Sequence, residues 1–346
     1  MKNFQGFINQ VYRTATVGDT ALTLSDWAQR RDPDGTVADI VEVLARTNEI
    51  IEDMMWVESN QATSHVSTIR SGYPSGTWRM FNYGVSQEKS RTVQISDGMG
   101  MLETYSKVDK ALADLNGDSA AFRFSEDKAF IEGLNQSFAE TLFYGSKLEP
   151  QKFVGFSPRY NDTPQDTDDL LSTFNIIDAG GTGSDNTSIW LVVWGANTCH
   201  GIFPKGGNAG LLSRDLGEDT LFDENGNEYQ GYRTHYKWDC GLTIRDWRYV
   251  TRIANIDVSD LTKDASAGAD LIDLLIQMVE RPPSLGMGRP VIYCNRTIRS
   301  FLRRQIVNKD NVYLNMDEVA GKMVLRFDEI PVRRVDAILN TEAQVA

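Results

Sequence analysis

The sequence predicts an α+β fold that carries a long, largely polar β-arm. Helical and strand-like segments interleave along the chain without the regular strand–helix–strand period of a doubly wound sheet. Residues 58–107 lack helical periodicity and alternate polar with β-branched or aromatic side chains. A two-stranded ribbon is marginal in water by itself, so we expect this arm to lie on another surface, either its own body or a neighbouring copy.

Composition indicates a folded, acidic protein of 346 residues, with 41% hydrophobic and 24% charged side chains. The 35 basic and 48 acidic residues give a net charge of −13, which argues against tight sequence-independent DNA binding. No run approaches the ~18 apolar residues of a membrane span, and residues 1–19 lack a signal-peptide pattern, so we expect cytosolic synthesis and no membrane partner. The three cysteines are far apart, which favours buried thiols: Cys199, Cys240 and Cys294.

The N-terminal region predicts a helix docked on a body, followed by the arm. Asp32 or Asp34 can cap this helix, and apolar residues follow at helical spacing as far as Met54. Within the arm, residues 65–70 and 91–96 alternate like two strands, and the sequence GYPSG punctuates the segment between them.

Further along, the chain predicts a long helix and then a β-rich body. Ser125–Tyr144 carries an apolar stripe, acidic residues in its first turn and a glycine stop, and would run about 30 Å. Residues 146–189 are rich in loops. The other expected elements are a helix at 105–118, strands at 189–195, a hairpin turning at Asn225-Gly226, a strand run at 243–258, a helix at 268–283, a strand at 289–295, a helix at 296–308, and two final strands broken at Pro331.

A glycine-rich stretch at 179–185 raises the question of a phosphate loop. In phosphate-binding turns the glycines follow a strand and open a helix, whereas Gly180, Gly181 and Gly183 precede a strand. We therefore expect a surface turn. In the following strand, Ile189, Leu191 and Val193 would point to one face and Trp190, Val192 and Trp194 to the other, with both faces covered.

The residues offer no catalytic, cofactor or metal signature. The only histidines are His65, His200 and His235, and Cys199-His200 would point to opposite faces of a strand. Residues 223–228 lack the spacing of a calcium loop and favour a hairpin turn. No GxSxG occurs, and the basic helix around Arg296–Arg304 favours an exposed face or acidic neighbours over nucleic acid. We expect no enzyme, no cofactor and no metal.

The order of these segments resembles the major capsid proteins of tailed bacteriophages with the HK97-type fold. The resemblance covers nearly the whole chain and is strongest to short-tailed phages of the epsilon15 and BPP-1 kind. The stretches that carry it are VADIVEVLARTNEIIEDMMW, GMGMLETYSKVDKALADLNGD, IIDAGGTGSDNTSIWLVVWG, YQGYRTHYKWD and the closing FDEIPVRRVDAIL.

The resemblance implies a division into capsid domains. Residues 1–57 resemble the N-arm and 58–107 the E-loop. Residues 108–185 with 318–346 resemble the peripheral (P) domain, whose spine helix is the long helix above, and 186–317 resemble the axial (A) domain.

The resemblance also implies an icosahedral shell of pentamers and hexamers around double-stranded phage DNA. Scaffolding and portal proteins are the implied partners, together with a decoration protein of the kind that some relatives carry, and assembly is expected in the host cytoplasm. In one branch of the family an E-loop lysine forms an isopeptide bond, but nothing beyond Lys89 supplies that chemistry here. We expect intersubunit contacts from the E-loop and a hinge at the three glycines; the contact residues are Arg70, Trp78, Arg79, Lys89 and Arg91.

A protein of another class remains open from the residues alone. Seven tryptophans and 12 tyrosines could furnish stacking platforms in a carbohydrate- or surface-binding β protein. Lone aromatic residues are more often part of a core, and the chain shows no repeat of the kind that lectins carry. A hydrolase with an unidentified carboxylate pair is a weaker option.

Overall fold

Two compact units share the chain in the computed structural model. The structure describes residues 48–162, 172–223, 225–262, 268–308, 314–319 and 322–345. The larger unit consists of 46–102, 135–210 and 239–346, and the smaller of 1–45, 103–134 and 211–238. Three elements contribute residues to both units: β3 (Arg91–Asp109), α5 (Ser119–Tyr144) and β8 (Glu228–Ile244).

The sheet of the larger unit is built around β5 (Asn186–Trp194), every residue of which is buried. β9 (Val250–Asp257) and β10 (Arg289–Cys294) both pair with β5 in antiparallel orientation. The other strands of this unit are, in chain order, β1 (Trp56–Glu58), β2 (Ser64–Gly72), β4 (Ile176–Asp178), β6 (Cys199–Phe203), β11 (Leu314–Val319), β12 (Lys322–Phe327) and β13 (Ile330–Arg334). β4 pairs in parallel with β9, and β13 in parallel with β10.

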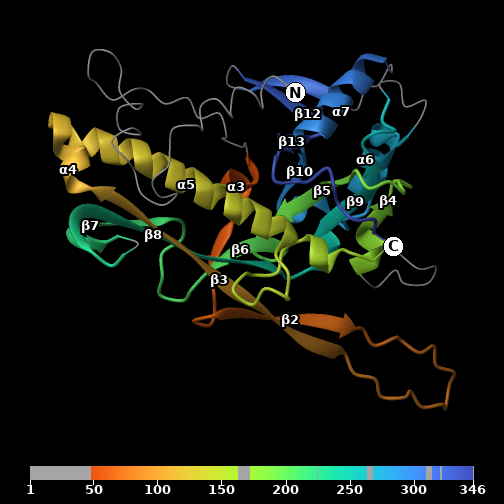
Figure 1. Cartoon of the computed structure of the whole chain (residues 1–346). Coiled ribbons are helices and arrows are strands. Elements are labelled where there is room, and N and C mark those ends of the chain that lie inside the picture. Colours follow the sequence, from red (N-terminus) through yellow and green to blue (C-terminus); the bar gives the residue numbers. More distant parts are fainter. Residues whose placement is uncertain are drawn as a thin grey trace. The chain divides into compact units, whose positions relative to one another are not determined.

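Both faces of β5 are covered, which confirms the alternation expected from the sequence. On one face, Ile189 and Leu191 pack in a core with residues of α6 (Leu271–Glu280) and α7 (Arg296–Asn308). α6 and α7 lie together beside the strands β9 and β10 (Figure 1). On the other face, the Trp190 ring lies 6.1 Å from the ring of Phe143 and 5.7 Å from that of Phe156. A strand buried on both sides requires the continuous apolar run that this segment has.

The smaller unit combines a β-hairpin with two helical segments. β7 (Leu212–Phe222) and β8 pair in antiparallel register from Leu212↔Lys237 to Phe222↔Glu228. The Asp223 side chain accepts hydrogen bonds from the backbone N–H groups of Asn225 (2.9 Å) and Asn227 (2.7 Å), and Gly226 has φ +82°. The predicted turn at Asn225-Gly226 is therefore confirmed. Side chains from β3, α4 (Lys110–Ala113) and α5 form its core, with Tyr232 beside them: Val108, Leu112, Ala113 and Phe122.

Several predicted boundaries are wrong. The helix expected at 105–118 is mostly strand, because β3 continues to Asp109 and leaves only the short α4. α5 begins at Ser119 rather than Ser125, after a break at Gly117, whose φ of +76° cannot continue a helix. The predicted N-terminal helix lies mostly outside the described residues; its described end is α3 (Ile50–Asp53), after which β1 begins at Trp56.

Two strand predictions also need correction. The run at 243–258 is interrupted because the Asp246 side chain accepts from the N–H of Arg248 and begins a 3₁₀ turn. The final pair of strands breaks at Asp328 (φ +50°) instead of Pro331, which lies inside β13. The 3₁₀ segments are Asp114–Asn116, Ser157–Arg159, Ser172–Asn175, Trp247–Tyr249 and Leu285–Met287. The limits of the capsid domains inferred from the resemblance remain predictions. The two compact units of the structure have different boundaries from those domains.

Candidate intersubunit surface

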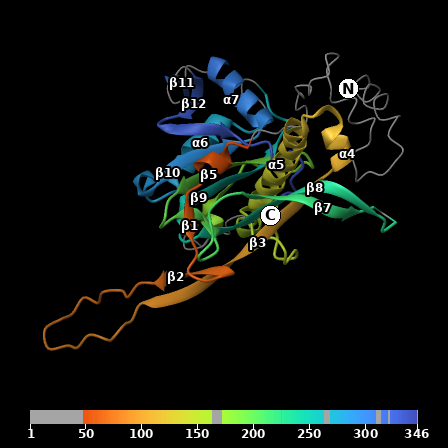
Figure 2. The same cartoon turned by 90° about the vertical axis from the view of Figure 1, so that its left-hand side faces the viewer.

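The predicted arm is a β-hairpin that ends in an 18-residue loop. β2 pairs with the first part of β3 in antiparallel register, from Ser64↔Gly98 to Gly72↔Arg91. Residues 73–90 between the paired ends form no strand or helix. Both views show this loop projecting away from the sheet of the larger unit, at the end of the hairpin (Figures 1 and 2). The structure thus confirms the two strands expected at 65–70 and 91–96.

Large apolar side chains on the loop are exposed to solvent. Trp78 is completely exposed and Phe81 is 91% exposed. Other large apolar residues of the loop are also more than half exposed: Tyr73, Met80, Tyr83 and Val85. So many exposed large apolar side chains in one short segment are uncommon on a monomer, and this loop is therefore a candidate interaction surface.

The predicted contact residues with positive charge lie on or beside this loop. Arg70 lies near the end of β2, where it pairs with Thr92, and its guanidinium lies 5.9 Å from the centre of the Tyr73 ring. Arg79 and Lys89 are exposed loop residues, and Arg91 begins β3. Within the described part of the chain, none of these four cations lies in ion-pair range of a carboxylate. Their charges are therefore available to a carboxylate of another molecule.

The base of the hairpin is fixed to the body of the same unit. Arg159 forms an ion pair of 2.8 Å with Asp97, whose side chain is buried. The Asn60 side chain holds β2 through the backbone of Val66, accepting from its N–H (2.9 Å) and donating to its carbonyl (2.7 Å). A loop on an anchored hairpin is presented in a defined direction, which lowers the entropic cost of using it in a contact.

The three glycines of the predicted hinge lie in the connection between β4 and β5. Gly180 has φ +81°, and its N–H donates to Asp178 Oδ1 at 2.9 Å. Gly181 donates to the carbonyl of Asn255 at 2.8 Å, and a Cβ on Gly183 would lie 2.5 Å from Asp257 Oδ2. The backbone of β9 comes so close to Gly181, and the Asp257 side chain so close to Gly183, that a larger side chain would not fit at either position. The hinge role itself stays a prediction.

The three cysteine thiols are buried and form no disulfide, as the sequence predicts. Burial raises the pKa of Cys294 to about 12 and also raises the pKa of Cys199 and Cys240. Protonated thiols are poor nucleophiles, so these side chains suit packing. Among the residues that the structure describes, no group of three or more His, Cys, Asp or Glu side chains could hold a metal.

A contact between His65 and His200 was missed by the sequence reasoning. Their rings lie 5.7 Å apart, edge to face, where β2 meets the body. Neither ring nitrogen of buried His200 has a hydrogen-bond partner in the described structure. Burial, aided by the neighbouring His65, lowers the pKa of His200 to about 4. Nothing local in the sequence signals this pair, because the two residues come from distant segments.

Among the described residues, no helix has both the length and the apolar character needed to cross a bilayer. The basic helix α7 has an acidic neighbour, since Arg296 lies 3.3 Å from Asp336. This contact agrees with the expectation of acidic partners for that helix.

Comparisons with known proteins identify the class to which this fold belongs. A chain in the solved structure of bacteriophage epsilon15 is 40% identical and superposes with a TM-score of 0.76, covering 96% of this chain and 99% of that one. A chain of the bacteriophage JBD30 capsid is 10% identical, with a TM-score of 0.48 and coverage of 86% and 93%. A chain of the SrpI encapsulin complex from Synechococcus elongatus PCC 7942 is 12% identical, with a TM-score of 0.42 and coverage of 70% and 99%. No curated protein matches the chain.

The match to the epsilon15 chain shows that the fold is the HK97-type fold of a bacteriophage shell protein. A family model for the major capsid protein GP7 matches residues 32–346. The chain belongs to this family and is a structural protein of the virion shell that associates with copies of itself. A carbohydrate-binding β protein, left open by the aromatic content, is not favoured by these findings.

Proposed function

We propose that the loop at residues 73–90 joins neighbouring copies of this chain in an icosahedral shell of pentamers and hexamers. The single observation that carries this proposal is the exposure of Trp78 and the other apolar side chains of the loop. Each such contact is weak by itself. Contacts repeated around a closed ring add to each other through multivalency, which suits a shell built from one chain.

Charge complements the apolar contact. The free cations Arg70, Arg79, Lys89 and Arg91 would pair with carboxylates of the adjacent copy, on its spine helix or P domain. The chain as a whole supplies these carboxylates, since its net charge is −13. Attraction between a cationic loop and an acidic body favours encounter in the correct orientation.

The proposal gives the chain a container role without catalysis or cofactor. The enclosed cargo would be double-stranded phage DNA, close to the shell but not tightly held, because a strongly basic lining would trap it. Scaffolding, portal and decoration proteins would act with it, and assembly would take place in the host cytoplasm. The glycine connection at 179–185 would absorb the different bends of pentamers and hexamers. A structure of the assembled shell tests this hinge. If the backbone of residues 179–186 is the same in subunits of pentamers and of hexamers, the segment is not a hinge.

Deletion of the loop tests the proposed function. Because Gly72 and Arg91 are paired, a two-residue Asn-Gly turn can replace residues 73–90 and close the hairpin without altering its register. The shortened chain should stay soluble and folded, because the deleted side chains make few contacts within the chain. We expect no shells by electron microscopy and no fast-sedimenting material.

The control keeps the loop and changes Ser86 and Gln87, two exposed polar residues, to alanine. This variant should form normal particles. Particles of normal size and yield from the chain that lacks the loop would disprove the proposal.

A further inference from the structure

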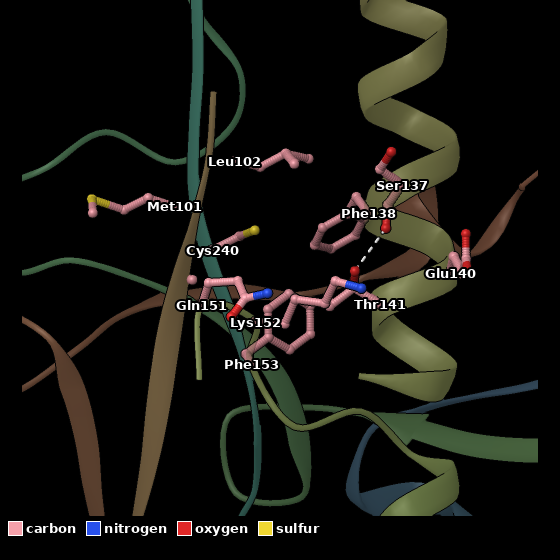
Figure 3. Close-up of a pocket in the computed structure, with 11 residues that line it drawn as sticks. Met101, Leu102, Ser137, Phe138, Glu140, Thr141, Gln151, Lys152, Phe153 and Cys240 are labelled. Atoms are coloured by element: carbon pink, nitrogen blue, oxygen red, sulfur yellow. Dashed lines mark hydrogen bonds between the residues drawn. The ribbon is translucent and has the colours of Figure 1, made fainter. Parts of the chain in front are cut away.

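A small apolar pocket opens beside the C-terminal half of α5, within the larger unit. Its volume is about 260 Å³, and its walls come from β3, α5, the segment 151–153 and β8. Figure 3 shows Phe138 extending from α5 toward β3, with Leu102, Cys240 and Phe153 around it. The remaining lining residues are Gly100, Met101, Ser137, Glu140, Thr141, Gln151 and Lys152.

The pocket is preformed by close backbone packing. The N–H of Gly145 donates to the carbonyl of Thr141 (2.8 Å), and the N–H of Gly155 donates to the carbonyl of Gly145 (2.8 Å). A Cβ on Gly155 would lie 2.6 Å from the carbonyl oxygen of Thr141, so the segment can approach the helix only as glycine. The Phe138 and Phe153 rings meet at 5.9 Å. These contacts fix the wall opposite β3.

The size and chemistry of the pocket suit one apolar side chain. Sites for small molecules usually enclose about 300–1,000 Å³, more than this pocket offers. Two polar side chains of its wall are already engaged, since Thr141 Oγ1 donates to the Ser137 carbonyl (2.8 Å) and Lys152 pairs with Glu149 (2.9 Å). Burial raises the pKa of the Cys240 thiol, which leaves it uncharged. Exposed Glu140 is the acidic group at the pocket.

The loop of the same copy cannot fill this pocket. Trp78 lies six residues beyond Gly72, so its backbone reaches at most about 20 Å from the paired end of the hairpin. Gly100 lies nine residues along the continuous strand β3 from Arg91, which is about 30 Å in the opposite direction. Both views show the loop directed away from this part of the unit. An occupant from the loop must belong to another copy.

We propose that Trp78 of one copy inserts its indole ring into this pocket of a neighbouring copy. The adjacent Arg79 would then face Glu140. The indole ring would meet the apolar wall of the pocket, and the positive charge would meet the negative one. Each copy carries a donor loop and an acceptor pocket, and a head-to-tail contact of this kind forms a ring when the rotation between successive copies closes. This inference rests on the proposed loop function and adds its receptor.

Site-specific photocross-linking tests the contact in assembled particles. The photoreactive amino acid p-benzoylphenylalanine replaces Trp78 in isotopically heavy full-length chains, which assemble together with light wild-type chains. We expect heavy-to-light cross-links to peptides that contain residues 100–102, 137–141 or 151–153. Cross-links within one copy, to residues 1–47, or only to other surfaces would overturn the proposal, as would particles without any pocket cross-link.

Substitutions on both sides of the contact provide a second readout. Trp78→Ala should lower the fraction of chain in particles about 10-fold or more, as for a buried aromatic anchor, whereas Trp78→Phe should retain most of it. Ser137→Phe places a bulky ring at the pocket from an exposed helix position and should act like Trp78→Ala. Lys147→Phe is the matched control, because Lys147 is exposed and does not line the pocket.

Failure of this inference is distinguishable from failure of the proposed function. If removal of residues 73–90 abolishes shells while Trp78→Ala and Ser137→Phe assemble normally, the loop is needed but this pocket is not its receptor. If the chain without the loop also assembles normally, the loop function fails as well.

Discussion

At the scale of single residues, a buried polar network of the larger unit surrounds Arg252. Its guanidinium is 1% exposed and lies 4.9 Å from the centre of the Trp190 ring. It donates to Glu342 (2.9 Å), to Ser188 Oγ (3.0 Å) and to the Tyr160 carbonyl (2.6 Å). Through Glu342, this network ties the C-terminal tail to β9. A buried charge with so many partners depends on each of them.

Removal of the Glu342 carboxylate should destabilise the subunit strongly. Glu342→Ala leaves the Arg252 charge buried without its counter-ion, and we expect the free energy of unfolding to fall by about 3–5 kcal/mol. Urea denaturation of unassembled subunits measures this change. As a control, Glu149→Ala breaks the half-exposed pair with Lys152 and should cost less than about 1 kcal/mol. Equal losses in the two variants would contradict the assigned importance of the buried network.

Acid should weaken the fold through His200. Its pKa is about 4 in the folded chain against an ordinary value of 6.5, and burial is the main cause. Between these values the unfolded chain binds a proton that the folded chain does not, so stability falls as pH falls from 6.5 to 4. The full effect is about 3 kcal/mol. Besides His65, the charged groups that act on this pair are Arg245 and Asp97.

His200→Gln removes this titration. Unfolding measured at several pH values should show a smaller loss of stability between pH 6.5 and 4 in the variant than in the wild type. An unchanged pH dependence would show that His200 is protonated equally in both states.

At the scale of elements, a glycine inside α5 and the glycine that follows it have opposite requirements. Gly133 is an exposed residue inside the helix, and a Cβ there would meet no atom within 4 Å. Gly145 follows the last helical residue, and a Cβ there would clash with the Phe153 carbonyl and lie 2.6 Å from that of Thr141. The first glycine weakens the helix, whereas the second allows the chain to pack against it.

Alanine at these positions should therefore act in opposite directions. Gly133→Ala should raise the free energy of unfolding by about 0.5–1 kcal/mol, because it removes backbone entropy from the unfolded chain. Gly145→Ala should lower it by about 1–3 kcal/mol through overpacking. Thermal and urea unfolding of both variants check the signs, and a stabilising Gly145→Ala would mean that the segment after the helix can shift freely.

At the scale of the whole molecule, the chain divides its polar and apolar surface between folding and assembly. The sheet of the larger unit buries its own apolar residues on both faces, while the loop at 73–90 exposes apolar residues beside free cations. The net charge of −13 opposes premature association of the bodies, so attraction is confined to specific places. This division explains how a stable subunit can also be a component of a shell.

Much of this fold could be predicted from local patterns. The continuous apolar run of β5, the hairpin turn at Asn225-Gly226 and the apolar stripe of the long helix each determine an element through nearby residues. Boundaries were harder, because a capping side chain such as Asp246 or a positive φ at Gly117 ends an element within a pattern that otherwise continues. The two-stranded arm was expected from its alternation of polar and β-branched or aromatic residues, whereas the 18-residue loop at its end, with its exposed apolar side chains, was not predicted.

The sequence alone determined the class of the protein, the order of its elements and the arm that must find a partner. The class came from the resemblance of its segments to a known family. The order of the elements and the arm follow from periodicity, turn residues and charge, which act over a few neighbouring positions. Only the tertiary structure decided which distant residues meet: His65 with His200, Arg252 with Glu342, and the strands and helix that enclose the pocket. Such contacts depend on how strands are paired and how closely glycines let backbones approach, and no local pattern encodes them.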